Sequence, residues 1–134
     1  VYGPWGRPDM AYYSFTKKIL NNEQIEVYNY GKVERDFTYI DDIVSGIRSS
    51  IENNYFYEIF NLGNAKKEKV LSLIKVIEKK LGKKANIVFK PLKSGDVIST
   101  SADISKSSAM LGYHPKTNID IGLEKFIQWY TNYI

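Results

Sequence analysis

The sequence predicts a domain of the α/β class, with helices packed on a small mixed sheet and with α+β as the open alternative. Two observations support this. Segments whose apolar residues recur with helical spacing are interleaved with short segments that alternate apolar and polar residues. The length of 134 residues, with 43% hydrophobic and 25% charged residues, is ordinary for one globular domain.

The first half of the chain predicts two helices separated by strands. A helix is expected at 10–20, with Asp9 favouring its N-terminus, followed by strands at 25–30 and 35–40. Asp41 or Asp42 can cap the next helix. Its apolar residues share one face: Ile40, Ile43, Val44, Ile47 and Ile51.

The second half continues the same alternation. A short apolar strand at 57–62 ends in a turn signal at 61–64. A helix with one apolar face then runs up to Gly82, strand 86–90 is stopped by Pro91, and the loop that follows leads to a short helix at 104–111. The core faces of the two longer helices are expected to be Val70, Leu73, Ile74, Ile77 and Leu81, and Leu123, Phe126, Ile127, Tyr130 and Ile134.

Composition excludes several classes of site. The chain has no Cys and only one His, His114, so disulfides, thiolate metal sites and His-based metal clusters are excluded, and a reducing compartment is compatible. No apolar run approaches the roughly 18 residues of a membrane span. The net charge of +4 comes from lysines spread over helix faces and ends. These lysines form either a solvated surface or a patch that attracts an anion such as a nucleotide diphosphate, without a nucleic-acid partner.

Three short motifs carry side chains suited to anions or hydroxyls. In GPWGRPD, Arg7 stands on a loop braced by prolines, and its planar fork suits a carboxylate or phosphate; the alternative is that it braces its own loop. In RDFTYIDD, Arg35 precedes a helix start, where it can bind an anion together with free backbone amides. In KSGDV, Lys93 can contact phosphate and Asp96 a ribose diol, or the segment is an ordinary polar turn.

The remaining candidates have simpler interpretations. The pair Asp41 and Asp42 fits helix capping better than acid-base chemistry or metal binding. Tyr28 and Tyr30, in strand 25–30, can stack on a base or pack in the core. The residues by themselves show no catalytic triad, metal set or phosphate loop.

Taken together, five stretches of the chain resemble one enzyme family. VYGPWGRPDMAYYSFTKKIL, VYNYGKVERDFTYIDDIVSGI, FNLGN, GDVISTSAD and LGYHPKTNIDIGLEKFIQWY resemble, in this order, the C-terminal part of the extended short-chain dehydrogenase/reductases that act on nucleotide sugars. RDFTYIDD is shared across many epimerases and dehydratases of that superfamily, whereas VYGPWGRPDMA resembles the UDP-glucuronate 4-epimerases. The resemblance implies a substrate-binding region, residues 1–134, of a Rossmann-type enzyme.

The resemblance also implies roles for five residues. Arg7 would pair with the sugar carboxylate, Tyr28 would pack against uracil, and Arg35 would bind the diphosphate. Asp96 would accept the ribose hydroxyls. Lys93 stands where several relatives have a phosphate-binding arginine, so it keeps the charge but loses the fork.

For the intact enzyme, the resemblance implies oxidation at sugar C4 by bound NAD, rotation of the 4-keto sugar and return of the hydride. The Gly-rich NAD loop and the Tyr-x-x-x-Lys pair would lie in roughly 180 to 200 further N-terminal residues. Tyr13 and Lys17 have that spacing but follow GPWGRPD, whereas the family's pair precedes it. The chain alone is therefore expected to hold no catalytic residue and to be inactive, and the whole enzyme to be a cytoplasmic homodimer. A UDP-N-acetylhexosamine 4-epimerase, a nucleotide-sugar dehydratase and a non-catalytic nucleotide-sugar binding module remain as alternatives.

Overall fold

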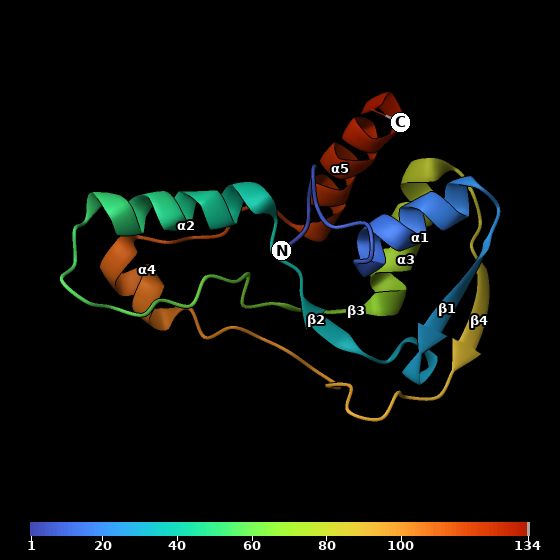
Figure 1. Cartoon of the computed structure of the whole chain (residues 1–134), viewed down its shortest axis with the longest axis horizontal. Coiled ribbons are helices and arrows are strands. Elements are labelled where there is room, and N and C mark those ends of the chain that lie inside the picture. Colours follow the sequence, from blue (N-terminus) through green and yellow to red (C-terminus); the bar gives the residue numbers. More distant parts are fainter. Residues whose placement is uncertain (134) are drawn as a thin grey trace.

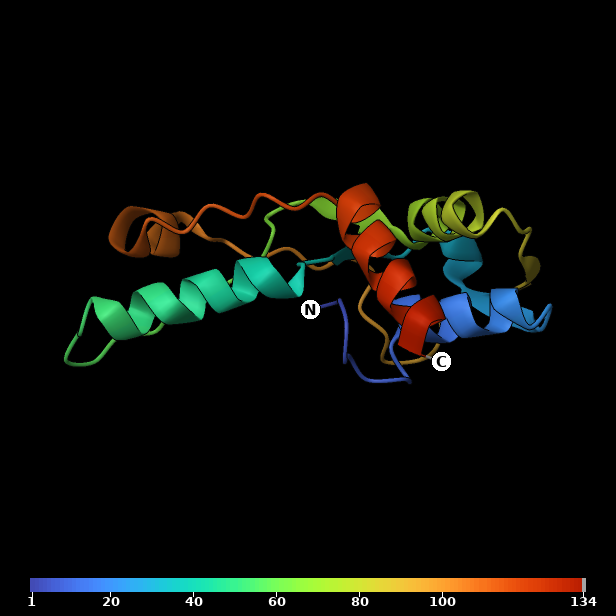
Figure 2. The ribbon, with the colours of Figure 1, turned by 90° about the horizontal axis from the view of Figure 1, so that it is seen from above.

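The computed structural model describes residues 1–133, which form a packed lobe and a thinner arm (Figures 1 and 2). In the lobe, α3 packs against both α1 and α5, and strands β1 and β4 lie at the edge of the lobe with β1 against α1, whereas α2 and α4 lie side by side in the arm. The elements in chain order are α1 (Ala11–Leu20), β1 (Gln24–Tyr28), the 3-10 helix η1 (Asn29–Gly31), β2 (Glu34–Asp36), α2 (Ile40–Glu52), β3 (Lys67–Lys69), α3 (Val70–Leu81), β4 (Asn86–Lys90), α4 (Ser105–Leu111) and α5 (Ile119–Tyr133).

The expected small mixed sheet consists of two separate two-stranded sheets. Strand β1 pairs in parallel with β4, from Gln24 opposite Asn86 to Tyr28 opposite Lys90. Strand β2 pairs antiparallel with β3. The α/β class is confirmed, with one parallel and one antiparallel pair.

The core lies where α1, α3 and α5 meet β1. Alternation along β1 buries Ile25 and Val27, and the predicted faces of α3 and α5 meet them there. Edge-to-face aromatic contacts link α1 to α5, including Tyr12 against Phe126 with ring centroids 4.7 Å apart. Ile134, which was expected on the core face of the last helix, lies outside the described residues.

The predicted strand at 57–62 is wrong. No strand pairs with this segment within residues 1–133, and Phe56, Tyr57 and Ile59 are exposed. A strand is stabilised by hydrogen bonds to a neighbouring strand, so an apolar alternating segment without a neighbour stays irregular.

The predicted strand at 86–90 is confirmed as β4, whereas the strands predicted at 25–30 and 35–40 are shorter than expected. Strand β1 ends at Tyr28 because Asn29 and Tyr30 adopt positive φ of 48° and 52° and turn the chain. Beyond Asp36 the chain leaves β3, and Tyr39 forms an isolated bridge with Tyr2.

No helix in residues 1–133 is long and apolar enough to cross a membrane.

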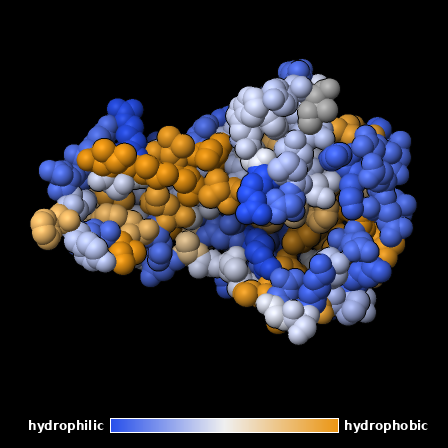
Figure 3. Space-filling model, viewed as in Figure 1, coloured by the Kyte–Doolittle hydropathy of each residue, from blue (hydrophilic) through white to orange (hydrophobic). Residues whose placement is uncertain are grey.

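The apolar face predicted for α2 is only partly covered. Val44, Ile47 and Ile51 are about half exposed or more, and Figure 3 shows a hydrophobic patch on the arm beside hydrophilic residues.

Candidate functional site

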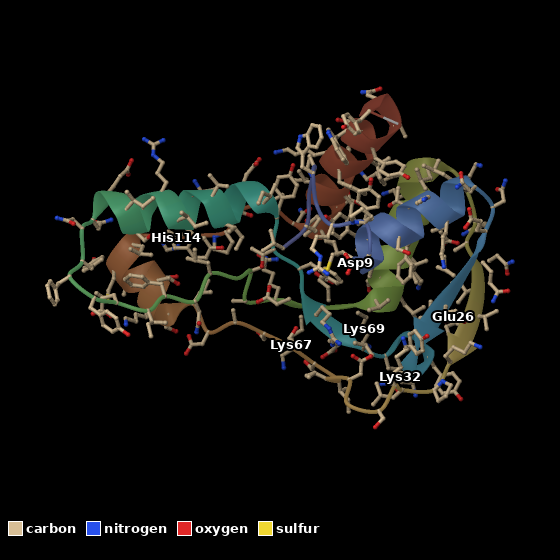
Figure 4. The ribbon with its side chains drawn as sticks, in the orientation of Figure 1. Asp9, Glu26, Lys32, Lys67, Lys69 and His114 are labelled. Carbon is tan, nitrogen blue, oxygen red and sulfur yellow. The ribbon has the colours of Figure 1, made fainter. Side chains whose placement is uncertain are left out.

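A cavity of about 370 Å³ lies between α1 and the strands β1 and β2. Its size falls within the range of small-molecule sites. Residues of the N-terminal segment and α1 give it an apolar wall: Val1, Tyr2, Met10, Ala11, Tyr12 and Phe15. The polar side chains come from β1, β2 and the loop after β4: Glu26, Tyr28, Arg35, Asp36 and Asp96. We call this cavity the α1–β2 pocket. In Figure 4, Asp9 marks the α1 side and Glu26 the β1 side.

Tyr28 ends β1 at the rim of this pocket, held by its neighbours. Its hydroxyl donates to Glu26 Oε2 at 2.8 Å, and this bond lowers the pKa of the Glu26 carboxyl. Lys93 Nζ lies 4.2 Å from the centroid of the Tyr28 ring, a cation–π contact. One face of the ring is therefore covered by a lysine.

Arg35 enters the pocket from β2 and faces Asp96. Its Nη1 donates to the Glu34 carbonyl at 2.9 Å, and its Nη2 lies 3.9 Å from Asp96 Oδ1. Asp96 closes a turn with Lys93, whose carbonyl accepts the Asp96 N–H at 3.1 Å, and Gly95 supplies the positive φ of 83°. A long, partly exposed ion pair is weak, so Arg35 can exchange Asp96 for a bound anion.

Arg7 does not line the pocket. Its Nε and Nη2 donate to the two carboxylate oxygens of Asp9 at 3.1 and 2.6 Å, and both side chains are mostly exposed. This bond raises the pKa of Arg7 and lowers that of Asp9. The fork thus grips a carboxylate in the two-pronged manner predicted, but the carboxylate belongs to its own loop.

Asp36, which follows Arg35 in RDFTYIDD, connects several segments through its carboxylate. Its Oδ1 accepts the N–H of Asn64 at 2.8 Å and the hydroxyl of Thr38 at 3.3 Å. Its Oδ2 accepts the N–H groups of Ala65 at 3.0 Å and Ala102 at 2.9 Å. The alternating pattern of β2 did not reveal this role, because the three amides come from distant parts of the chain.

The expectation that Asp41 or Asp42 caps α2 is wrong, because the N-cap residue is Tyr39 and both aspartates lie in the first turn. Asp42 is buried and accepts the N–H groups of Lys116 and Thr117, each at 3.0 Å. The Ile40 N–H donates to the Tyr2 carbonyl, so it is not free to share an anion with Arg35.

The other titratable candidates lie elsewhere. His114 is exposed on the arm, away from the pocket (Figure 4). Tyr13 packs against Phe126 and Tyr130 on α5. Among residues 1–133, no group of three His, Cys, Asp or Glu side chains could hold a metal ion.

Comparison with known proteins shows what the chain is similar to. The sequence profile of the NAD dependent epimerase/dehydratase family matches residues 1–63, which contain α1, β1, β2 and Arg35. The first 63 residues of the chain are therefore similar to the NAD dependent epimerase/dehydratase family. Individual relatives match nearly the whole chain. An uncharacterized protein of Methanocaldococcus jannaschii, MJ1055, is 55% identical over 97% of this chain and 40% of its own length.

Two further relatives carry a functional description. UDP-glucuronate 4-epimerase 1 of Arabidopsis thaliana is 43% identical over 99% of this chain and 35% of its own length. The crystal structure of UDP-glucuronic acid 4-epimerase from Bacillus cereus, in complex with UDP-glucuronic acid and NAD, superposes with a TM-score of 0.92 at 34% identity, covering 99% of this chain and 43% of that one. The chain thus spans less than half the length of these relatives, and its structural neighbours are Rossmann-type extended enzymes.

Proposed function

We propose that this chain is the substrate-binding part of an NAD-dependent epimerase that interconverts UDP-glucuronate and UDP-galacturonate. One observation carries the proposal: Tyr28, Arg35 and Asp96 line a single pocket of ligand size, in a chain similar throughout to UDP-glucuronate 4-epimerases. These residues come from two strands and a distant loop, and the fold alone brings them together.

Each residue suits one part of the nucleotide. The free donors of Arg35 suit the diphosphate, and the two oxygens of Asp96 suit the vicinal ribose hydroxyls. Tyr28 offers a ring for the base, provided that Lys93 moves from the ring toward the phosphates. Arg7 would bind the sugar carboxylate in exchange for Asp9, which already shows the geometry of that contact.

The described residues do not fit NAD. They contain no glycine-rich loop between a strand and a helix, so the cofactor would be held by residues outside this chain, where it supplies hydride transfer at sugar C4. What this chain contributes is a grip on the UDP while the sugar turns. By itself the chain should not catalyse the reaction.

Exposed apolar residues on the arm support the proposal that this chain is part of a larger protein. Ile47 and Ile51 on α2 and Tyr57 in the unpaired segment are exposed apolar residues of the kind that meet another domain. We infer that α2 and 57–62 pack on an N-terminal NAD-binding domain that supplies the neighbouring strand. The whole protein would act in the cytoplasm as a homodimer.

The test is an assay of the full-length protein with UDP-glucuronate, followed by chromatography of the nucleotide sugars. The expected product is UDP-galacturonate, with none formed by residues 1–134 alone. Turnover of UDP-N-acetylglucosamine but not UDP-glucuronate would overturn the uronate assignment and favour the hexosamine epimerase. UDP binding without turnover of any UDP-sugar would favour the non-catalytic binding module.

A further inference from the structure

We propose that Asp36 is a positioning residue for the α1–β2 pocket: its carboxylate ties residues 98–102 to strand β2 and thereby sets where Asp96 stands against Arg35. We call residues 98–102 the strap. This inference rests on the proposed role of the pocket in binding UDP.

The strap runs parallel to β2 along the edge that β3 leaves free. The Glu34 N–H donates to the Ile98 carbonyl at 2.9 Å, and the Thr100 N–H donates to the Glu34 carbonyl at 3.3 Å. Two residues further on, the Asp36 N–H donates to Thr100 Oγ1 at 3.3 Å. The Ala102 N–H donates to Asp36 Oδ2, so Asp36 fixes the far end of the strap.

The same carboxylate ties a second segment to this point. The amides of Asn64 and Ala65 donate to its two oxygens. Ala65 adopts a positive φ of 55°, a conformation that persists in a non-glycine residue only where surrounding contacts hold it. Asp36 therefore anchors three backbone amides from two loops, and hydrogen bonds to a charged acceptor are stronger than those to a neutral one.

Close packing leaves these loops little freedom to shift. A Cβ added to Gly63 would lie 2.4 Å from the Ala102 Cβ and 2.9 Å from Asp36 Oδ2. Both loops thus meet at Asp36 with no room for a side chain. Because the two loops are closely packed at Asp36, a displacement there should move the strap.

The strap leads directly to the ligand-facing turn. Asp96 lies two residues before Ile98, and Lys93 begins the same turn. Arg35 is held by β2, to which the strap is tied, so the distance from Arg35 to Asp96 depends on where the strap sits. Asp36 thus acts on the pocket through the loop that it anchors.

The test compares Asp36→Asn with Asp42→Asn in the full-length protein, using UDP as the ligand in calorimetry. Asp42 is a matched control, because its carboxylate also accepts backbone amides but lies on α2 and holds 116–117 instead of the strap. We expect Asp36→Asn to raise the UDP dissociation constant about fivefold and Asp42→Asn to change it less than twofold, although both lower the Tm. In turnover, Asp36→Asn should raise KM while kcat stays within about twofold.

A second variant keeps the carboxylate and displaces the strap. Gly63→Ala should weaken UDP binding in the same direction, and it decides the question if Asp36→Asn fails to fold. Equal losses of affinity in Asp36→Asn and Asp42→Asn, or unchanged affinity in Gly63→Ala, would overturn the positioning role. Arg35→Gln separates the two proposals. If it binds UDP as the parent protein does, the proposed function of the pocket fails; if it loses UDP while Asp36→Asn does not, only the role of Asp36 fails.

Discussion

At the scale of single residues, the site depends on a guanidinium that is free to change partner. Arg35 makes one short hydrogen bond to its own strand and a long ion pair with Asp96, so several of its donors remain available. Lysine at the same position would keep the charge but lose the fork that matches a phosphate oxygen pair.

We therefore expect Arg35→Lys to weaken UDP binding by the full-length protein about tenfold. Arg48→Lys is the matched control, because Arg48 pairs with Glu52 on the exposed side of α2 and should leave the affinity unchanged. Isothermal titration with UDP measures both. Equal affinity in the two variants would show that Arg35 does not contact the nucleotide.

Asp42 gives a prediction about stability. Its buried carboxylate accepts two backbone amides, and in Asp42→Asn an NH₂ group would face at least one of these donors. Urea unfolding should show a loss of about 2 kcal/mol for Asp42→Asn. Asp41→Asn, at an exposed residue paired loosely with Lys125, should cost less than about 0.5 kcal/mol. Similar losses in both variants would contradict the anchoring role.

Short sequence motifs pointed to several residues that line the candidate site, but not to the residues that anchor the loops around it. Tyr28, Arg35 and Asp96 were named as candidates from the strand at 25–30, RDFTYIDD and KSGDV, and the fold places all three in one pocket. Their roles toward a nucleotide stay predictions. The anchoring roles of Asp36 and Asp42 were not readable. Their partners are backbone amides 28 to 75 residues away, which leave no trace in side-chain identity.

At the scale of elements, helices were predicted better than strands. The faces of α3 and α5 follow from the spacing of their own apolar residues, and both helices pack as expected. A strand needs a neighbour, and no strand among residues 1–133 pairs with 57–62. The short strand β3 was missed because Lys67–Lys69 carries no apolar alternation and is defined only by pairing with β2.

We expect charged substitutions on the apolar face of α2 to reduce self-association of residues 1–134 alone but to destabilise the full-length protein. Ile47 and Ile51 are exposed here, so residues 1–134 alone should self-associate. The double variant Ile47→Glu, Ile51→Glu should reduce that association in light scattering with unchanged circular dichroism. Ser45→Glu, on another side of the helix, should not.

In the full-length protein the same double variant should lower the Tm, because both side chains would then be buried against the NAD-binding domain. A full-length protein that tolerates both glutamates would contradict the docking of α2 on that domain. A monodisperse monomer of residues 1–134 would contradict the self-association.

At the scale of the whole molecule, buried tyrosines tie distant segments together. The Tyr2 hydroxyl donates to the Asn118 carbonyl, Tyr12 to Gly3 and Tyr113 to Gly63. Each bond joins elements that are far apart in the chain or fixes the N-terminal loop on α1. Burial raises the pKa of all three phenols, and that of Tyr113 reaches about 12.

These raised values predict how stability depends on pH. A phenol in the unfolded chain ionises near pH 10, whereas Tyr113 in the folded chain ionises near 12. The unfolded state therefore loses its proton first, so this contribution is complete below about pH 10 and is lost as the pH rises from 10 through 12. Urea midpoints measured across that range, with absorbance at 295 nm to follow ionisation, should fall together with the appearance of tyrosinate.

Tyr113→Phe assigns part of this dependence to one residue. At pH 7 the variant should be less stable by about 1 kcal/mol, because the hydrogen bond to the Gly63 carbonyl is lost. Between pH 10 and 12 its stability should fall less steeply than that of the parent chain, since one phenol no longer favours the unfolded state, and the two curves should converge. Parallel curves through this range would mean that Tyr113 titrates alike in the folded and unfolded states, which would contradict the raised pKa of its buried phenol.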